Sequence, residues 1–154
     1  MAVTALYNRV TARGQFTIGN IMTLQQLEQC RVEARKLWLS GWWLLNSDRC
    51  LTECNGIGAL WMGFLCKLLN FLMPSFVTAS AIHDMRYFLN EGDRHHWDDE
   101  FETNCRAVLR DRYGRCNTVR YVGYWLARRL RVALTIGGEI AWDNAGKRFT
   151  EEAP

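Results

Sequence analysis

Several patterns that would assign a function directly are missing from this sequence. No CxxC pair occurs, and His95 and His96 do not lie at a zinc-finger spacing from any pair of cysteines. The longest apolar run covers residues 58–73, contains Lys67 and Asn70, and is shorter than the roughly 20 residues needed to cross a bilayer. Internal repeats and low-complexity tracts are also lacking. We therefore expect neither a structural zinc module nor a membrane span.

Histidine is scarce, and its positions narrow the chemistry. The chain has three histidines: His83, His95 and His96. An HD-type phosphohydrolase needs a further histidine upstream of its His-Asp pair. No histidine precedes His83, so the sequence disfavours this class of enzyme. His95 and His96 are interpreted as surface residues in the first turn of a helix. No cysteine lies in a recognisable nucleophile context, which disfavours Cys-His catalysis.

The cysteines form an even count, which would suit a disulfide framework, but the start of the sequence indicates reduced thiols. The first 15 residues lack the basic and then apolar pattern of a secretory signal, so we expect a cytoplasmic location and reduced thiols. The six cysteines are Cys30, Cys50, Cys54, Cys66, Cys105 and Cys116.

The composition is that of one domain with a core of its own. The chain has 154 residues, of which 49% are hydrophobic, so folding requires no disulfide or metal. The net charge is +3, yet eight arginines and a single acid, Asp111, lie between Arg106 and Arg131. This segment predicts a cationic surface. Such a surface either binds an acidic protein or anionic lipid headgroups, or is a solvated helix face without a partner. Nucleic acid is not the expected partner, because no recognised reading motif accompanies the arginines.

Helical periodicity dominates the chain, and the fold is predicted to be mainly α within one domain, residues 1–154. Residues 1–21 are predicted to form an arm, with GQFTIGN as its best strand candidate. Thr23 and Gln26 form a capping box at the start of a helix that Gly41 can interrupt. The expected segments are helices over residues 23–45, 75–89, 94–113 and 117–136, a loop over 46–58, and an irregular tail over 137–154 with Trp142 packed back.

The motif ASAIHDMRY places His83, Asp84 and Tyr87 on one predicted helix. His83 and Tyr87 share a face, whereas Asp84 is rotated by about 100° around the axis. A short turn after residue 89 makes the next helix antiparallel, so Asp98 is expected to lie opposite His83. A carboxylate that fixes one imidazole nitrogen leaves the other free to take a proton from water, as a general base does.

Asp84 points away from the His83 face of the helix and therefore needs a partner other than Asp98. A hard cation is suited to its carboxylate. The loop CNGIGA, residues 54–59, has two glycines at alternating positions, which lets successive carbonyls converge on one point. Arg86, close to Asp84 in the sequence, is a competing partner for that carboxylate.

Together, CNGIG, the pattern A-S-x-x-H-D-x-x-Y, and the pattern R-x-x-W-D-x-x-F-x-x-N from residue 94 to 104 resemble the phospholipase A2 superfamily. The resemblance is closest to its short bacterial and phage-encoded members, and it covers residues 53–113 as a phospholipase A2-like core. It implies an antiparallel helix pair with a calcium loop, and calcium-dependent hydrolysis of the sn-2 ester of phospholipids.

The resemblance also implies a role for each matching residue. His83 is the base that activates water, Asp98 orients it, and Tyr87 supports Asp98. Calcium is held by Asp84 and by backbone oxygens of the loop. These oxygens belong to Cys54, Gly56 and Gly58.

Two differences from the secreted enzymes keep other interpretations open. The cysteines that brace their helices are replaced here by other residues, and Ala59 stands in place of the last loop glycine. Three interpretations of the apolar run 58–73, together with Trp42 and Trp43, stay open. These residues line a slot for an acyl chain, face a membrane interface, or belong to the hydrophobic core. The alternative function is a non-catalytic, phospholipase A2-like interaction or virion-associated protein that uses the basic segment Arg106 to Arg131.

Overall fold

The computed structural model describes residues 22–54, 74–114 and 118–151, with side chains as far as Lys147. Within these residues the chain is helical and contains no strand, which confirms the predicted mainly α class. None of the described helices is both long and apolar enough to span a bilayer. The predicted N-terminal strand, the apolar run 58–73, Gly56 and Gly58 lie outside the described residues.

The first described helix, α2 (Leu24–Lys36), begins at the predicted capping box. Thr23 Oγ1 accepts a hydrogen bond from the backbone N–H of Gln26 at 3.2 Å, and Gln26 Oε1 accepts one from the Thr23 backbone at 2.9 Å. The prediction of one helix over residues 23–45 is wrong. The helix ends at Lys36, and Trp38 and then Gly41 have left-handed backbones with φ of +50° and +79°. A separate 3₁₀ turn, η1 (Trp42–Asn46), follows Gly41.

The segment predicted as a loop over residues 46–58 contains a short helix, α3 (Cys50–Glu53). Its first residue, Cys50, is fully buried, and its thiol donates a hydrogen bond to the Leu44 carbonyl at 3.4 Å. A buried anchor therefore orders part of a stretch whose composition is typical of loops.

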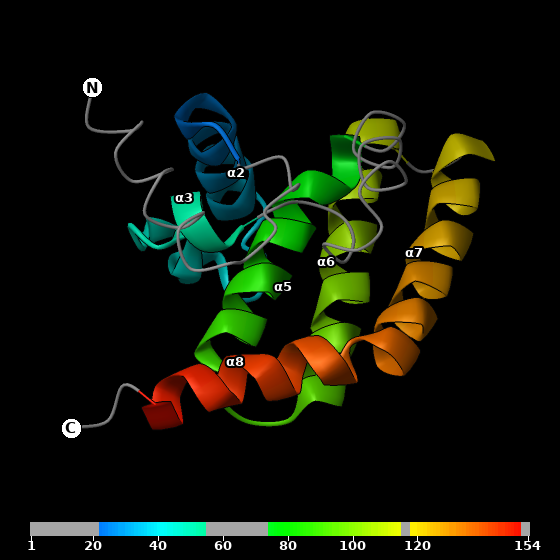
Figure 1. The fold of residues 1–154 in the computed structure, drawn as a ribbon. Helices are drawn as coiled ribbons and strands as arrows, with labels where there is room; N and C mark the ends of the chain where they lie inside the picture. Colours follow the sequence, from blue (N-terminus) through cyan, green and yellow to red (C-terminus); the bar gives the residue numbers. More distant parts are fainter. Residues whose placement is uncertain (1–21, 55–73, 115–117, 152–154) are drawn as a thin grey trace.

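A helical hairpin forms the centre of the molecule (Figure 1). A 3₁₀ turn, η3 (Pro74–Phe76), leads into α5 (Val77–Leu89), which ends at Asn90 with φ of +51°. The Asp93 side chain caps α6 (Arg94–Tyr113) by accepting the His95 N–H at 3.0 Å. The short turn between the two helices makes them antiparallel neighbours.

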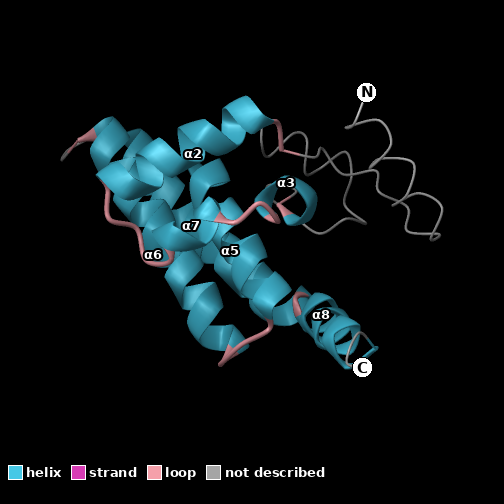
Figure 2. Cartoon of the chain, turned by 90° about the vertical axis from the view of Figure 1, so that its left-hand side faces the viewer, coloured by secondary structure: helices cyan, strands magenta, loops and turns pink. Residues whose placement is uncertain are grey.

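Two more helices complete the described chain. Helix α7 (Thr118–Gly137) packs along α6, and α8 (Glu139–Glu151) packs against α5, as Figures 1 and 2 show. The prediction of an irregular tail over residues 137–154 is thus wrong, because residues 139–151 are helical. Trp142 does pack back, with its ring centroid 5.3 Å from that of Tyr87.

The core has two parts, one on each side of the hairpin. The first joins α2, η1 and α3 to α5, and the second joins η3 and α5 to α6 and α7. Its largest fully buried apolar side chains are Phe76, Leu27, Leu39, Leu45, Ile82, Met85 and Val108. This packing fixes the two central helices, from which most of the candidate site projects.

Candidate active site

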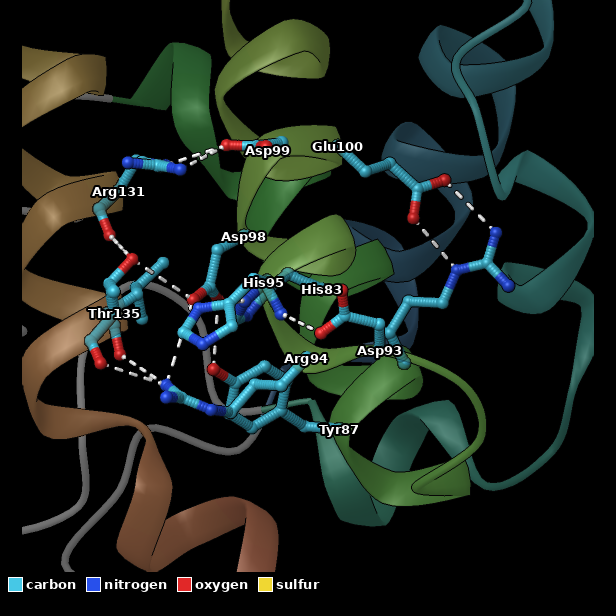
Figure 3. A network of polar contacts seen from close by, with 12 residues as sticks. His83, Tyr87, Asp93, Arg94, His95, Asp98, Asp99, Glu100, Arg131 and Thr135 are labelled. Carbon is cyan, nitrogen blue, oxygen red and sulfur yellow. Dashed lines mark hydrogen bonds and ion pairs between the residues drawn. The ribbon is translucent and has the colours of Figure 1, made fainter.

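Asp98 lies at the centre of a buried polar network between α5, α6 and α7 (Figure 3). Its side chain is 0% exposed. The Oδ1 atom of Asp98 lies 3.0 Å from Nε2 of His83 and accepts a hydrogen bond from the Tyr87 hydroxyl at 2.9 Å. His83 and Tyr87 are one helical turn apart on α5, so both reach the same carboxylate oxygen from one face.

The second oxygen of Asp98 is held by residues that the sequence analysis did not identify. Thr135 Oγ1 lies 3.4 Å from Oδ2, and Arg94 Nη1 lies 3.8 Å from the same atom. Arg94 Nη1 also donates to the carbonyls of Leu134 and Thr135, at 3.2 and 3.0 Å. The guanidinium therefore joins the carboxylate to the C-terminal turn of α7, where carbonyls concentrate negative charge.

These contacts set the protonation of the network. Burial raises the pKa of Asp98, but hydrogen bonds from His83 and Tyr87 and the charges of His83 and Arg94 outweigh it, so this pKa lies below its usual value. Asp98 is thus a carboxylate at neutral pH and accepts the proton of His83 Nε2. Burial and the neighbouring Asp98 carboxylate raise the pKa of Tyr87, which keeps its phenol protonated as a donor.

The imidazole is held in one orientation by aromatic neighbours. His83 is 6% exposed, and its ring centroid lies 5.4 Å from that of Phe101 and 4.3 Å from that of Tyr87. With Nε2 on Asp98, Nδ1 is the nitrogen that can accept a proton. The arrangement can therefore perform general-base chemistry at a fixed position.

Asp84 is on α5, and its charge acts on Cys54, the first residue of the predicted calcium loop. The Cys54 thiol is buried and donates to the Ala81 carbonyl at 3.3 Å, which places this loop residue against α5 one turn before Asp84. Hydrogen bonding with Cys50 and burial raise the pKa of Cys54, and the Asp84 charge raises it further. The Cys54 carbonyl accepts the Met22 N–H at 3.4 Å.

Within the described part of the chain, no three His, Cys, Asp or Glu side chains gather as a metal-binding group. The predicted calcium site relies instead on one carboxylate and loop carbonyls, and its glycines, Gly56 and Gly58, lie outside that part. Asp84 is half-buried, and its charge acts on Cys54. A carboxylate beside the first residue of a carbonyl-bearing loop is a donor set suited to a hard cation.

Arg86 has a partner that the sequence analysis did not anticipate. Its Nε and Nη2 atoms donate to the two carboxylate oxygens of Glu100, at 2.8 and 3.0 Å, and its guanidinium stacks 3.9 Å above the Trp97 ring. Residues two apart on a helix project about 200° apart. Arg86 therefore points to α6 on a different side of α5 from Asp84.

Arg86 lies nearer the turn than His83, whereas Glu100 lies farther from the turn than Asp98, so the antiparallel spacing that predicted His83–Asp98 does not indicate this pair. The i,i+4 spacing of Arg94 and Asp98, in contrast, was readable. Thr135 left no such signal, because it comes from a distant helix.

Comparisons with models of protein families, with curated proteins and with solved structures gave no match. The likeness to phospholipase A2 therefore stands on the motif residues themselves.

Proposed function

We propose that the protein is a phospholipase A2-type hydrolase that cleaves the sn-2 ester of phospholipids with calcium as cofactor. The observation that carries this proposal is the hydrogen-bonded group of His83, Asp98 and Tyr87. The charge of Asp84, which acts on Cys54, supports it.

In this proposal the buried carboxylate and the imidazole act together. Asp98 holds the proton of His83 on Nε2, which leaves the lone pair of Nδ1 to take a proton from the attacking water. Tyr87 stabilises Asp98 as a carboxylate and limits its rotation. No serine or cysteine nucleophile is required, because water itself attacks the ester.

Asp84 would hold calcium together with the backbone carbonyls of Cys54, Gly56 and Gly58. When bound, calcium supplies positive charge that polarises the ester carbonyl and offsets negative charge on the phosphate. Asp84 also keeps a second negative charge beside the loop, separate from the one that Asp98 directs to His83.

The test measures fatty acid release from mixed micelles of phospholipid and detergent, with calcium or with a chelator. We expect release only with calcium, and we expect His83→Gln and Asp84→Asn to abolish it while circular dichroism shows an intact fold. His95→Gln and Asp48→Asn are matched controls, since both residues are exposed and outside the network. Calcium-independent release, or full activity of His83→Gln, contradicts the proposal.

A non-catalytic, phospholipase A2-like interaction protein is the second candidate. It is favoured by one observation, the apolar and basic residues exposed along α7. Such a protein would release no fatty acid and would be indifferent to both substitutions.

A further inference from the structure

Helix α7 is apolar on two opposite faces. Its inward face packs on α6, where Gly123 and Ala127 are buried and an added Cβ on Gly123 would lie 2.8 Å from a Leu109 methyl group. The solvent face of such a helix normally carries polar residues. Here it exposes Trp125 by 59% and Ile136 by 77%. Burial against the described helices therefore does not account for the apolar residues of the outward face.

The exposed residues form a regular stripe. We name this set the outward stripe: Val122, Trp125, Arg129, Val132 and Ile136. Steps of three and four residues alternate along it, which is the spacing with which one helix presents a seam to another helix. Val122 and Val132 are 56% and 38% exposed.

The charge of this surface has one sign. Helix α7 contains four arginines and neither aspartate nor glutamate. Arg131 is bound by Asp99 at 2.7 Å, and Arg120 is buried. Arg128 and Arg129 are exposed and take part in no ion pair among the described residues, and Arg129 stacks 5.2 Å from the Trp125 ring. A charged residue inside an otherwise apolar seam selects a partner of opposite charge.

A second copy of this chain and a lipid surface fit the outward stripe less well than a helix of a partner protein. A second copy would bring its own Arg128 and Arg129 against the same residues, with no carboxylate on either α7. A lipid surface bound here would lie on the far side of α6 from Cys54 and Asp84, as the order of α3, α5, α6 and α7 in Figure 1 shows. A partner helix on α7 leaves that side open.

We propose that the outward stripe of α7 binds an amphipathic helix of a partner protein, with acidic side chains placed opposite Arg128 and Arg129. Trp125 is the central apolar anchor of this contact, and Arg129 sets its specificity. Only the preference for a protein helix over a lipid surface rests on the proposed function. The binding test needs no catalytic activity, so it and the hydrolysis test can fail separately.

The test uses the full chain and a synthetic peptide three heptads long, with leucine at the seam positions and glutamate beside them. Isothermal titration should give saturable binding to this peptide and none to a scrambled peptide of the same composition. Trp125→Ala should weaken binding roughly 30-fold, as for a central aromatic anchor, and Arg129→Glu roughly tenfold. Trp38→Ala and Arg110→Glu, which alter exposed residues elsewhere, should leave binding unchanged.

Three results would overturn the proposal. One is the absence of saturable binding by a folded wild-type chain. The second is binding that neither Trp125→Ala nor Arg129→Glu weakens. The third is a different occupant: sedimentation with vesicles of phosphatidylcholine and phosphatidylglycerol, or a dimer in light scattering, that the same two substitutions abolish.

Discussion

Two polar pairs with little exposure connect α5 to α6, and they differ in whether the basic side chain keeps a nitrogen that its carboxylate does not engage. In the pair Arg86–Glu100 both nitrogens that face the carboxylate donate to it, and the guanidinium is covered by Trp97. In the pair His83–Asp98 only one imidazole nitrogen is engaged by the carboxylate. A guanidinium stays protonated in proteins, whereas imidazole exchanges protons near neutral pH. Both pairs have little exposure, so exposure does not distinguish them. The difference is Nδ1 of His83, a nitrogen that the carboxylate does not engage and that can accept a proton.

The comparison predicts different losses when each carboxylate is neutralised. In Asp98→Asn the amide can donate to Nε2 of His83, which moves the imidazole proton to Nδ1 and removes the base. We expect hydrolysis to fall roughly 1,000-fold, equivalent to ~4 kcal/mol of transition-state stabilisation. Steady-state kinetics in mixed micelles measures the loss.

The control for this substitution is Asp99→Asn, on the same helix. Asp99 is 60% exposed and paired with Arg131, so its neutralisation should leave the rate nearly unchanged. Equal rates for Asp98→Asn and the wild type would remove Asp98 from the proposed mechanism.

Neutralising the other carboxylate should affect folding instead of catalysis. Glu100→Gln leaves Arg86 without its charge partner in a site where the two side chains are 4% and 15% exposed. Breaking such a pair by removing one member should lower the free energy of unfolding by about 3 kcal/mol. Urea unfolding measures this change, while the rate per folded molecule should stay constant.

Asp111→Asn is the matched control at an exposed ion pair, since Lys36 and Asp111 are 63% and 35% exposed. This substitution should lower the free energy of unfolding by less than about 1 kcal/mol. If Glu100→Gln lost activity at unchanged stability, the division between a structural and a chemical pair would be wrong.

The helices were predicted best from the sequence where capping residues and local periodicity mark their ends. Helix α6 begins and ends at the predicted residues, since Asp93 caps it and Gly114, with φ of +64°, ends it. Gly41 marked a possible interruption of the first helix, but the end of α2 at Lys36 and the left-handed backbone of Trp38 had no local signal. Tertiary packing also excludes a side chain at Gly41, where an added Cβ would lie 2.7 Å from an Ile82 methyl group.

The same distinction applies to the site. His83, Tyr87 and Asp98 were predicted as neighbours because one hairpin brings them together, and the structure places them in contact. Their roles in hydrolysis stay predictions. Thr135 and the helical α8 were missed, since both depend on how the C-terminal half folds back over α5 and α6.

The corner between α7 and α8 gives a prediction with a smaller effect than those for Asp98 and Glu100. Gly138, buried at the corner between α7 and α8, has no room for a side chain, because an added Cβ would meet the Tyr87 hydroxyl and the Leu134 carbonyl. Gly138→Ala should therefore lower the free energy of unfolding by about 2 kcal/mol and displace Tyr87 from Asp98. Gly137→Ala is the matched control, since nothing lies within 4 Å of its added Cβ.

The source of this strain can be isolated in a double-mutant cycle with Tyr87→Phe, measured by urea unfolding. Removing the hydroxyl takes away one of the two groups that the new methyl meets, so Gly138→Ala should cost less in the Tyr87→Phe background. If the cost is the same in both backgrounds, the Leu134 carbonyl alone opposes the methyl group. The position of α8 would then not be coupled to the Tyr87–Asp98 hydrogen bond, and the polar network would depend only on α5, α6 and α7.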